Sequence, residues 1–475
     1  MDRVPRSATR ATGVPQTDLT IPAPVMALLR TLWGAGQAGY VVGGSVRDTL
    51  LGREPFDWDL ASDAPPERLV SLFPDAVYEN RFGTVAVRQG GELYAITTFR
   101  SDHDYADFRR PHRVEWTDRI ELDLGRRDFT VNAMAWGAGR LDAAAEPGGA
   151  AEPSPDAPRL VDPFGGRTDL GARLLRAVGE PAARFREDAL RIVRGVRLAA
   201  ALDFTIEPAT LAALGEQAHL VAHLSGERIA GELDRLLAAA QPSIGLRLLE
   251  STGVLGPISP QLAAQRGVPQ NKVPGEDLWD HTARTVDAST RRDPIVRLAA
   301  LLHDIGKPAT AADGHFIGHE RLGAELAADL LTRLRYPKPV IERVTRLVRL
   351  HMFAYEAGWS DTAVRRFIGK VGVEVLPQLW ALRAADNVGS GQAAGAGGLD
   401  ELSRRVEEQL AAEVVLDLHD LALDGDDLIR ELGMTPGPRI GRVLGELLER
   451  VIDDPQLNDR PTLLLLARTI AEEAG

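Results

Sequence analysis

The sequence predicts an α+β protein in which a mixed α/β head is followed by helical segments that continue to the C-terminus. Up to about residue 172, strand-like apolar runs alternate with Gly-rich turns and short helical patterns. From Arg173 onward, long runs with helical apolar spacing dominate. Because 475 residues exceed what one hydrophobic core usually organises, we expect several domains.

Five segments are expected along the chain. Residues 1–20 carry charge and proline without an apolar run, which predicts a disordered lead-in. The head spans residues 21–172, and an Ala/Pro/Gly-rich insertion at 137–158 is predicted to be a loop between two of its strands. Gly- and Pro-rich breaks divide the helical remainder into a neck, a central domain and a C-terminal domain at residues 173–265, 276–390 and 400–475.

Composition excludes several classes of protein. The net charge of −13 argues against binding nucleic acid through bulk charge, although it allows a local basic face. The chain has no cysteine, so disulfides and Cys-ligated zinc are excluded. It also lacks a run of about 18–20 apolar residues and an apolar secretory core. We therefore expect a cytoplasmic enzyme that does not enter a membrane.

The first chemical signal lies in residues 40–60. An apolar run ends at Gly43, Gly44 and Ser45, and a short helical pattern follows. Glycines at the start of a helix permit close backbone approach and leave N–H groups that suit phosphate. Asp57 and Asp59 lie two residues apart in a strand-like segment and are expected to share one face, opposite the apolar side chains of residues 56, 58 and 60.

Paired carboxylates can hold Mg²⁺, which prefers oxygen ligands. If Asp57 and Asp59 stood alone, a solvated strand edge would be the better explanation for them. The Gly-Gly-Ser segment just upstream favours the metal site, because a phosphate cradle beside two metal-binding carboxylates is the equipment of nucleotidyl transfer.

Two later segments carry charges that suit a nucleotide. Adjacent arginines in RRDFTVN, residues 126–132, can grip a triphosphate, although a surface turn with a capping Asp is the better explanation for this segment alone. In residues 183–200, predicted to be helical, Glu187, Asp188 and Arg191 fall within one turn and can face a base edge. An intrahelical salt-bridge set is the alternative. Residues 101–113 are polar and aperiodic, which predicts a mobile loop.

Taken together, these segments resemble the class II tRNA nucleotidyltransferases, or CCA-adding enzymes, and the related bacterial poly(A) polymerases. The resemblance implies a nucleotidyltransferase (polymerase beta-like) head with a mixed sheet, followed by an all-helical, RNA-binding neck. The matching motifs, in chain order, are VVGGSVRD, DWDL, ITTFR, FRRP, RRDFTVNAMA, LVDPFGG and RFREDALRIVR.

The resemblance also implies roles for individual residues. Catalysis and Mg²⁺ binding fall to Asp57 and Asp59, and the segment 101–113 matches the element linked to switching from C to A. Asp188 and Arg191 would hydrogen-bond the Watson–Crick edge of the incoming base. The full set implied to bind the nucleotide is Gly43, Gly44, Ser45, Arg47, Arg126, Arg127, Asp128, Asn132, Glu187, Asp188, Arg191 and Arg194.

One position departs from the family pattern. Many members carry a third carboxylate, Glu, where this chain has Ala95. Asp102 or Asp104 in the following segment could replace it. The departure leaves open how the metals are held.

A second candidate site lies in the helical centre. His281, His303, Asp304 and Asp386 resemble the ligand set of HD-domain phosphohydrolases, which implies an HD domain with a second divalent transition metal. Two further histidines, His319 and His351, could complete a second metal site there. A segment at 423–451 resembles the C-terminal helical module of the same nucleotidyltransferases.

The expected activity is template-independent addition of C, C and A to the tRNA 3′ end from CTP and ATP. The alternatives within the family are A-only addition, CC-only addition and poly(A) synthesis. An HD phosphohydrolase with a non-catalytic RNA-binding head is the alternative from another class. The sequence does not predict the oligomeric state.

Overall fold

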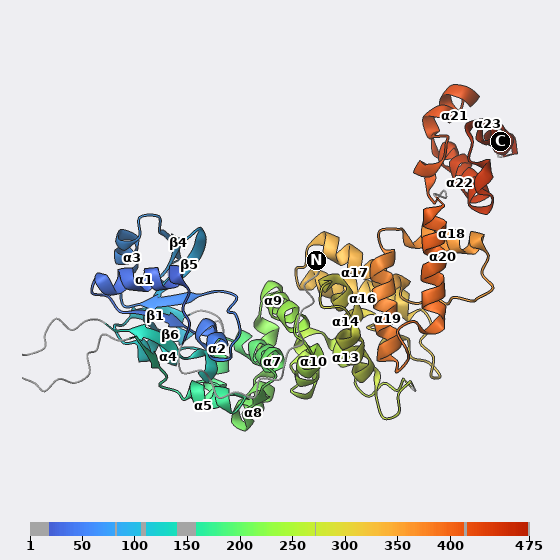
Figure 1. Cartoon of the computed structure of the whole chain (residues 1–475). Coiled ribbons are helices and arrows are strands. Elements are labelled where there is room, and N and C mark those ends of the chain that lie inside the picture. The colour runs from blue at the N-terminus through green and yellow to red at the C-terminus, as the bar shows by residue number, and fades with distance from the viewer. Residues whose placement is uncertain are drawn as a thin grey trace, which may run out of the picture. The chain divides into compact units, whose positions relative to one another are not determined.

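A computed structural model describes residues 19–80, 83–105, 111–139, 158–270, 272–412 and 416–473. Most of the predicted lead-in and of the 137–158 insertion therefore lies outside the described residues. The chain forms two compact units, residues 1–258 and 259–475. Figure 1 shows strands in the blue and teal part of the chain and helices from green to red. Within the described ranges, no helix is long and apolar enough to cross a membrane.

The described residues of the first unit contain a seven-stranded mixed sheet in the order β3-β4-β5-β2-β1-β8-β9. Only the β2–β5 pair within this sheet is parallel. Its register places Asp59 beside Ala95. The strands are β1 (Gly39–Val42), β2 (Asp59–Ser62), β3 (Val77–Asn80), β4 (Thr84–Gln89), β5 (Glu92–Thr98), β8 (Ala135–Ala138) and β9 (Arg159–Val161).

Short helices pack against this sheet and close the core of the head. Tyr40 and Val42 of β1 are buried together with Phe99 and Leu124, so the apolar run that precedes the glycines is a core strand. This burial fixes where the Gly-rich turn emerges from the sheet. The helices are α1 (Ala23–Gly34), α2 (Gly44–Leu50), α3 (Pro66–Leu72), α4 (Ile120–Gly125), η1 (Thr130–Asn132) and α5 (Gly166–Gly171).

The predicted loop at 101–113 is wrong for the residues that the structure describes. Strands β6 (Arg100–Tyr105) and β7 (Pro111–Trp116) pair antiparallel, with Arg100 opposite Trp116. Residues 106–110 lie outside the described residues. Backbone hydrogen bonds pair the two strands. Because the segment has no alternation of apolar and polar residues, its sequence did not predict these strands.

The rest of the first unit is almost entirely helical, as predicted from Arg173 onward. One expectation fails here: residues 183–200 are not one helix, because the chain is extended at Asp188 (φ −145°, ψ 105°) between α6 and α7. The elements are β10 (Leu174–Leu175), α6 (Pro181–Glu187), α7 (Leu190–Leu202), β11 (Thr205–Ile206), α8 (Pro208–Glu216), η2 (Ala218–His223), α9 (Gly226–Leu237), α10 (Pro242–Ser251) and α11 (Leu255–Ile258).

In the second unit, all the regular elements of the described residues are helices. Helix α13 packs on α14 and α19, and α14 also packs on α17. These elements are α12 (Pro260–Ala263), α13 (Leu278–Ala288), α14 (Pro294–Leu302), α15 (Lys307–Thr310), α16 (His319–Arg333), α17 (Lys338–Leu350), α18 (Asp361–Val371), α19 (Leu376–Gly389), η3 (Ala396–Gly398) and α20 (Leu399–Ala411).

The C-terminal helices bury a small apolar core of their own, which includes Leu428, Leu447 and Leu463. Buried Arg365 of α18 ties this core to the rest of the unit, because its Nε donates to the carbonyl of Ile452 at 2.7 Å. The elements are η4 (Leu418–Asp420), α21 (Gly425–Leu432), α22 (Pro438–Asp453), η5 (Pro455–Leu457) and α23 (Arg460–Glu473).

Candidate functional site

The glycine turn after β1 is shaped by its neighbours. Gly43 has φ +78°, a conformation that L side chains rarely adopt, and its N–H donates to the carbonyl of Met134 at 3.1 Å. A Cβ on Gly43 would lie only 2.6 Å from Nη1 of Arg127. The glycine therefore lets the Arg127 guanidinium rest against the turn.

Two polar side chains of α2 are already engaged. The buried Ser45 hydroxyl donates to the carbonyl of Val42 at 3.1 Å, so it fixes the turn internally. Arg47 is held by Asp48 at 2.8 Å, and its Nη1 donates to Oδ1 of Asn132 at 2.5 Å. The Arg47 side chain thereby orients the Asn132 amide.

Asp57 and Asp59 stand close enough to interact, although only Asp59 lies on β2 and Asp57 just precedes it. Burial and the charge of Asp57 raise the pKa of Asp59, and the Arg127 guanidinium opposes them. The apolar residue before Asp57, Phe56, is fully exposed, so it does not pack on the opposite face as expected. The two carboxylates form an acidic edge with one cation nearby.

The turn after α4 connects this edge to the helices that follow. Arg126 donates through Nε and Nη2 to Oδ1 of Asp123, at 3.0 and 2.8 Å. The carbonyl of Arg126 in turn accepts a 2.8 Å hydrogen bond from Nη2 of Arg191 in α7. Residues separated by 65 positions in the chain thus meet at one backbone group.

Asp128 joins the same turn to α7. Its carboxylate accepts from Nδ2 of Asn132 at 3.1 Å and from Nη1 of Arg194 at 3.1 Å. Burial alone would raise the pKa of Asp128, but the Arg194 charge and these hydrogen bonds lower it to about 2. The carboxylate therefore stays ionised and holds Asn132 in place.

The predicted base-facing residues are brought together, but each has a protein partner. Arg191 donates to Oε2 of Glu187 at 2.7 Å. The Asp188 carboxylate accepts a hydrogen bond from the N–H of Leu190 at 3.1 Å. Both of its oxygens also accept from Nη2 of Arg228, at 2.9 and 2.8 Å. The Asp188 carboxylate thus binds the first N–H of α7 at the point where the chain is extended between the two helices.

Two residues of α9 were missed by sequence reasoning. Arg228 holds Asp188, and buried Glu232 accepts from Nε of Arg194 and Arg197, at 3.4 and 2.6 Å. Their i, i+4 spacing in an amphipathic segment was the available signal. It indicated one helix face but not which side chains that face would meet.

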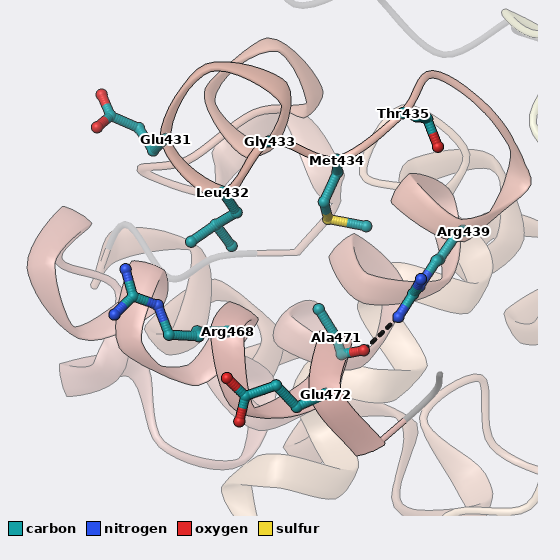
Figure 2. A pocket seen from close by; sticks show the side chains of 9 residues that line it. All are labelled: Glu431, Leu432, Gly433, Met434, Thr435, Arg439, Arg468, Ala471 and Glu472. Atoms are coloured by element: carbon teal, nitrogen blue, oxygen red, sulfur yellow. Dashed lines mark hydrogen bonds between the residues drawn. The ribbon is translucent and has the colours of Figure 1, made fainter.

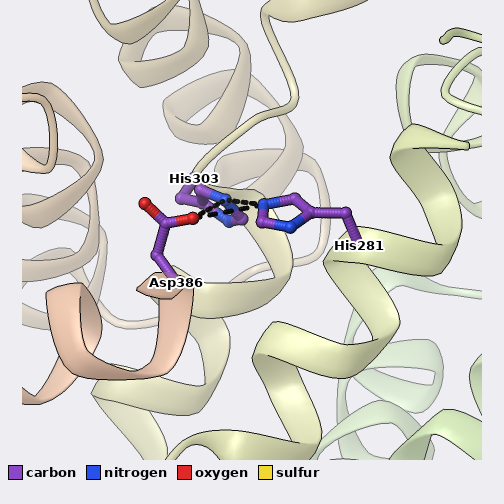
Figure 3. Close-up of side chains that lie close together, drawn as sticks. All are labelled: His281, His303 and Asp386. Atoms are coloured by element: carbon purple, nitrogen blue, oxygen red, sulfur yellow. Dashed lines mark hydrogen bonds and ion pairs between the residues drawn. The ribbon is translucent and has the colours of Figure 1, made fainter. Parts of the chain in front are cut away.

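A second cluster lies inside the all-helical unit. His281 of α13, His303 directly after α14 and Asp386 of α19 converge, as Figure 3 shows. The Nε2 atoms of the two histidines are 3.1 Å apart, and Nε2 of His281 lies 3.3 Å from Oδ1 of Asp386. All three side chains are buried.

Asp304 stands between this triad and a second one. Its Oδ2 is 3.1 Å from Nε2 of His303, and its Oδ1 is 3.3 Å from Nε2 of His319 and 3.6 Å from Nε2 of His351. One ligand atom from each of Asp304, His319 and His351 falls within 4.8 Å of the others. The residues singled out in the sequence thus form two adjacent donor groups.

The donor chemistry of this cluster suits divalent cations. Oδ1 of Asp304 and Nδ1 of His281 are buried and have no hydrogen-bond partner in the described structure. Neighbouring His303 and Lys307 hold the pKa of Asp304 well below its usual range, although burial acts in the opposite direction. Buried imidazoles around an ionised carboxylate fit a transition metal.

A hollow of about 650 Å³ lies in the C-terminal helices, away from both clusters in the chain. Figure 2 shows Leu432 and Met434 above it, with Arg439 turned toward the carbonyl of Ala471, to which it donates. The side chains of Arg439 and Arg468 are exposed. No buried polar group among its described lining residues points to a ligand.

Comparison with known proteins identifies the family. Residues 39–176 match the poly(A) polymerase head domain, 203–266 an RNA- and SrmB-binding site of polymerase A, and 319–467 tRNA nucleotidyltransferase domain 2. A CCA-adding enzyme of Streptococcus suis (strain 05ZYH33) is 31% identical over 446 residues, which cover 94% of this chain and 96% of that enzyme. The chain belongs to the tRNA nucleotidyltransferase family.

Other members extend the likeness. The A-adding tRNA nucleotidyltransferase of Deinococcus radiodurans is 33% identical over 435 residues, 86% of this chain and 90% of that protein. The Bacillus stearothermophilus CCA-adding enzyme in complex with CTP aligns with a TM-score of 0.69 and 27% identity, covering 96% of this nucleotidyltransferase and all of that chain. The predicted α+β class with a polymerase beta-like head is thereby confirmed.

Proposed function

We propose that this chain adds C, C and A to the 3′ end of tRNA, without a nucleic-acid template, from CTP and ATP. The observation that carries the proposal is the double contact made by the turn at Arg126 and Arg127. Arg127 rests on Gly43 and acts on Asp59, while the carbonyl of Arg126 anchors Arg191. One turn thus joins an acidic edge to a base-facing side chain.

Asp57 and Asp59 are the proposed catalytic carboxylates and Mg²⁺ ligands. Bound Mg²⁺ would supply activation of the primer 3′-hydroxyl and neutralise charge on the leaving pyrophosphate. The raised pKa of Asp59 supports this assignment, because a cation would relieve the repulsion that Asp57 imposes.

The triphosphate is assigned to the glycine turn and the paired arginines. Gly43 and Gly44 present backbone close to the guanidinium groups of Arg127 and Arg47, respectively. Asn132, which is oriented by Arg47 and Asp128, would bind the ribose. Arginine forks suit phosphate oxygens because they can bind bidentately.

Base selection is assigned to Asp188 and Arg191. Here Arg228 occupies the Asp188 carboxylate, and Glu187 holds Arg191. These partners fix both side chains before the base arrives, so the protein itself would serve as the template. Arg194 acts behind them through its ion pair with Asp128.

The decisive experiment offers purified protein three tRNAs, lacking CCA, CA or A, with each nucleotide given separately. We expect CTP to be added to the first two and ATP only to the third. Absence of CTP incorporation on all three would remove the proposal. The double variant Asp57→Ala, Asp59→Ala should abolish addition. Retained addition would instead remove the metal assignment.

A-only addition is the second candidate within the family. The 33% identity to the A-adding tRNA nucleotidyltransferase of Deinococcus radiodurans favours it. The same assay distinguishes the two functions, because an A-adding enzyme incorporates ATP on tRNA that lacks only A and leaves CTP unused on every substrate.

The His/Asp cluster supports a second activity, metal-dependent phosphohydrolysis. A bound transition metal would polarise a phosphate and its attacking water. His281, His303 and Asp386 would hold one ion, with Asp304 between it and a second group formed with His319 and His351.

The test uses His303→Ala, which we expect to lower bound metal and phosphohydrolase activity while nucleotide addition continues. His315→Ala is the matched control, because His315 lies in the same unit with an exposed side chain. Equal metal content and hydrolysis in both variants would contradict this second activity.

A further inference from the structure

Asp123 is a buried carboxylate to which the proposed function assigns no role. It lies in α4 and is 1% exposed. Its Oδ1 accepts from Nε and Nη2 of Arg126, at 3.0 and 2.8 Å, and its Oδ2 lies 3.5 Å from Nη2 of Arg127. One carboxylate therefore holds both arginines that are assigned to the triphosphate.

The two arginines lead from Asp123 to the rest of the site. Nη1 of Arg127 packs against Gly43, and the charge of Arg127 reaches Asp59. Arg126 supplies the carbonyl that receives Nη2 of Arg191. A change in the contacts between Asp123 and these guanidinium groups would therefore alter the surroundings of the glycine turn, the acidic edge and the base-facing arginine.

Asp123 also fixes the start of the two-stranded ribbon. Its Oδ1 accepts the backbone N–H of Arg100, the first residue of β6, at 3.3 Å. This contact fixes the position of the arginine pair relative to β6, the strand that follows β5 and Ala95 in the chain. The anchor is a backbone group, so it does not depend on a flexible side chain.

Packing alone does not account for a carboxylate at this position. An ionised group in a buried site loses solvation, and an apolar residue of similar size often serves stability equally well. Burial would raise the pKa of Asp123, but Arg126 and Arg127 lower it below the ordinary value, so the group is charged at neutral pH. The charge is useful where two guanidiniums must be held in one arrangement.

We propose that Asp123 is a positioning residue that pre-orients Arg126 and Arg127 for the nucleotide triphosphate. The inference rests on the proposed function, since it takes these arginines as triphosphate ligands. Asp123 acts through them and does not itself touch the nucleotide. Held in advance, the guanidiniums lose less conformational freedom when the nucleotide binds.

The test is Asp123→Asn, which keeps the shape and one acceptor oxygen but removes the charge. We expect the KM for both CTP and ATP to rise about tenfold, the size expected for loss of a charge-assisted contact. The KM for tRNA should stay near the wild-type value. Partial unfolding would lower the rate but not imitate this result, because KM does not depend on the fraction of folded enzyme.

Asp427→Asn is the matched control. Asp427 is also a buried carboxylate held by two arginines, Arg430 and Arg460, but it belongs to the C-terminal helices. It should lower the melting temperature without raising the KM for either nucleotide.

A second variant, Asp123→Glu, covers the case in which the Asn variant does not fold. Its charge is intact but its longer side chain displaces both guanidiniums, so the KM for nucleotide should again rise. Wild-type KM values for CTP and ATP in either folded variant would overturn the positioning role. Failure of the proposed function is separate, because then the wild-type protein itself would add no nucleotide.

Discussion

Asp59 and Ala95 lie side by side in the parallel pair of β2 and β5. Residues paired in this way project on the same face of a sheet, so a methyl group stands beside one carboxylate of the acidic edge. Asp102 and Asp104, the suggested substitutes, lie on β6, and their side chains are outside the described residues. The residue paired with Asp59 on β5 therefore brings no carboxylate to this edge.

Ala95→Glu should restore a third carboxylate at this edge. We expect the Mg²⁺ concentration for half-maximal nucleotide addition to fall about threefold to tenfold, because added carboxylate ligands strengthen Mg²⁺ binding. The measurement is a Mg²⁺ titration of addition rate. Leu93→Glu, at an exposed position two residues earlier on β5, is the control. An equal Mg²⁺ requirement in Ala95→Glu and wild type would contradict the prediction.

Asp128 should contribute stability that depends on pH. Its pKa is lowered from 3.8 to about 2 in the folded protein, so its contribution is complete above the unfolded value and is lost as pH falls through the folded one. The shift corresponds to about 2 kcal/mol. We expect Asp128→Asn to lower the melting temperature at about pH 7, with the deficit shrinking toward about pH 3.

The control for this pH effect is Asp118→Asn, which changes an exposed carboxylate in the same unit. Its melting temperature should follow that of the wild type throughout. A deficit in Asp128→Asn that is the same size at both ends of the pH range would argue against the ion pair with Arg194 as its source.

Arg228→Gln should relax base selection. Nη2 of Arg228 contacts both oxygens of Asp188, so its loss frees the carboxylate to rotate. We expect discrimination against UTP and GTP to fall about tenfold, in line with the loss of a charged hydrogen bond. Single-nucleotide incorporation with all four triphosphates measures it.

Arg235→Gln provides the comparison on the same helix. Arg235 is 67% exposed and only approaches Glu232 at 3.5 Å, so its removal should leave selection intact. If both variants discriminate equally well, Asp188 does not need Arg228 to present its carboxylate.

Divalent transition metals should stabilise the His/Asp cluster. Binding to the folded state alone adds about 3 kcal/mol when the free metal is a hundredfold above its dissociation constant. We expect Mn²⁺ or Co²⁺ to raise the melting temperature, a chelator to reverse the effect, and His303→Ala to abolish it. Asp57→Ala should keep the shift, since that residue belongs to the other unit. A shift that persists in His303→Ala would place the metal elsewhere.

The sequence by itself determined the order of the fold and much of the site's content. Tyr40 and Val42 are apolar and adjacent to glycines, so a core strand ending in a turn was predictable, and β1 is that strand. The members of the His/Asp cluster were also predictable as a set, through their resemblance to the ligand set of HD-domain phosphohydrolases. Local patterns carry this information since strand and helix periods act over a few residues.

Only the tertiary structure decided the partners. The Asp188 carboxylate pairs with Arg228, 40 positions later in the chain, and no local pattern reports such a contact. The ribbon of β6 and β7 forms through backbone pairing that leaves no apolar signature. The sequence pattern did not single out Asp123 as a site residue. Its contacts with Arg126 and Arg127 follow i, i+3 and i, i+4 spacing, but its burial and its bond to the N–H of Arg100, 23 positions earlier, are products of tertiary packing.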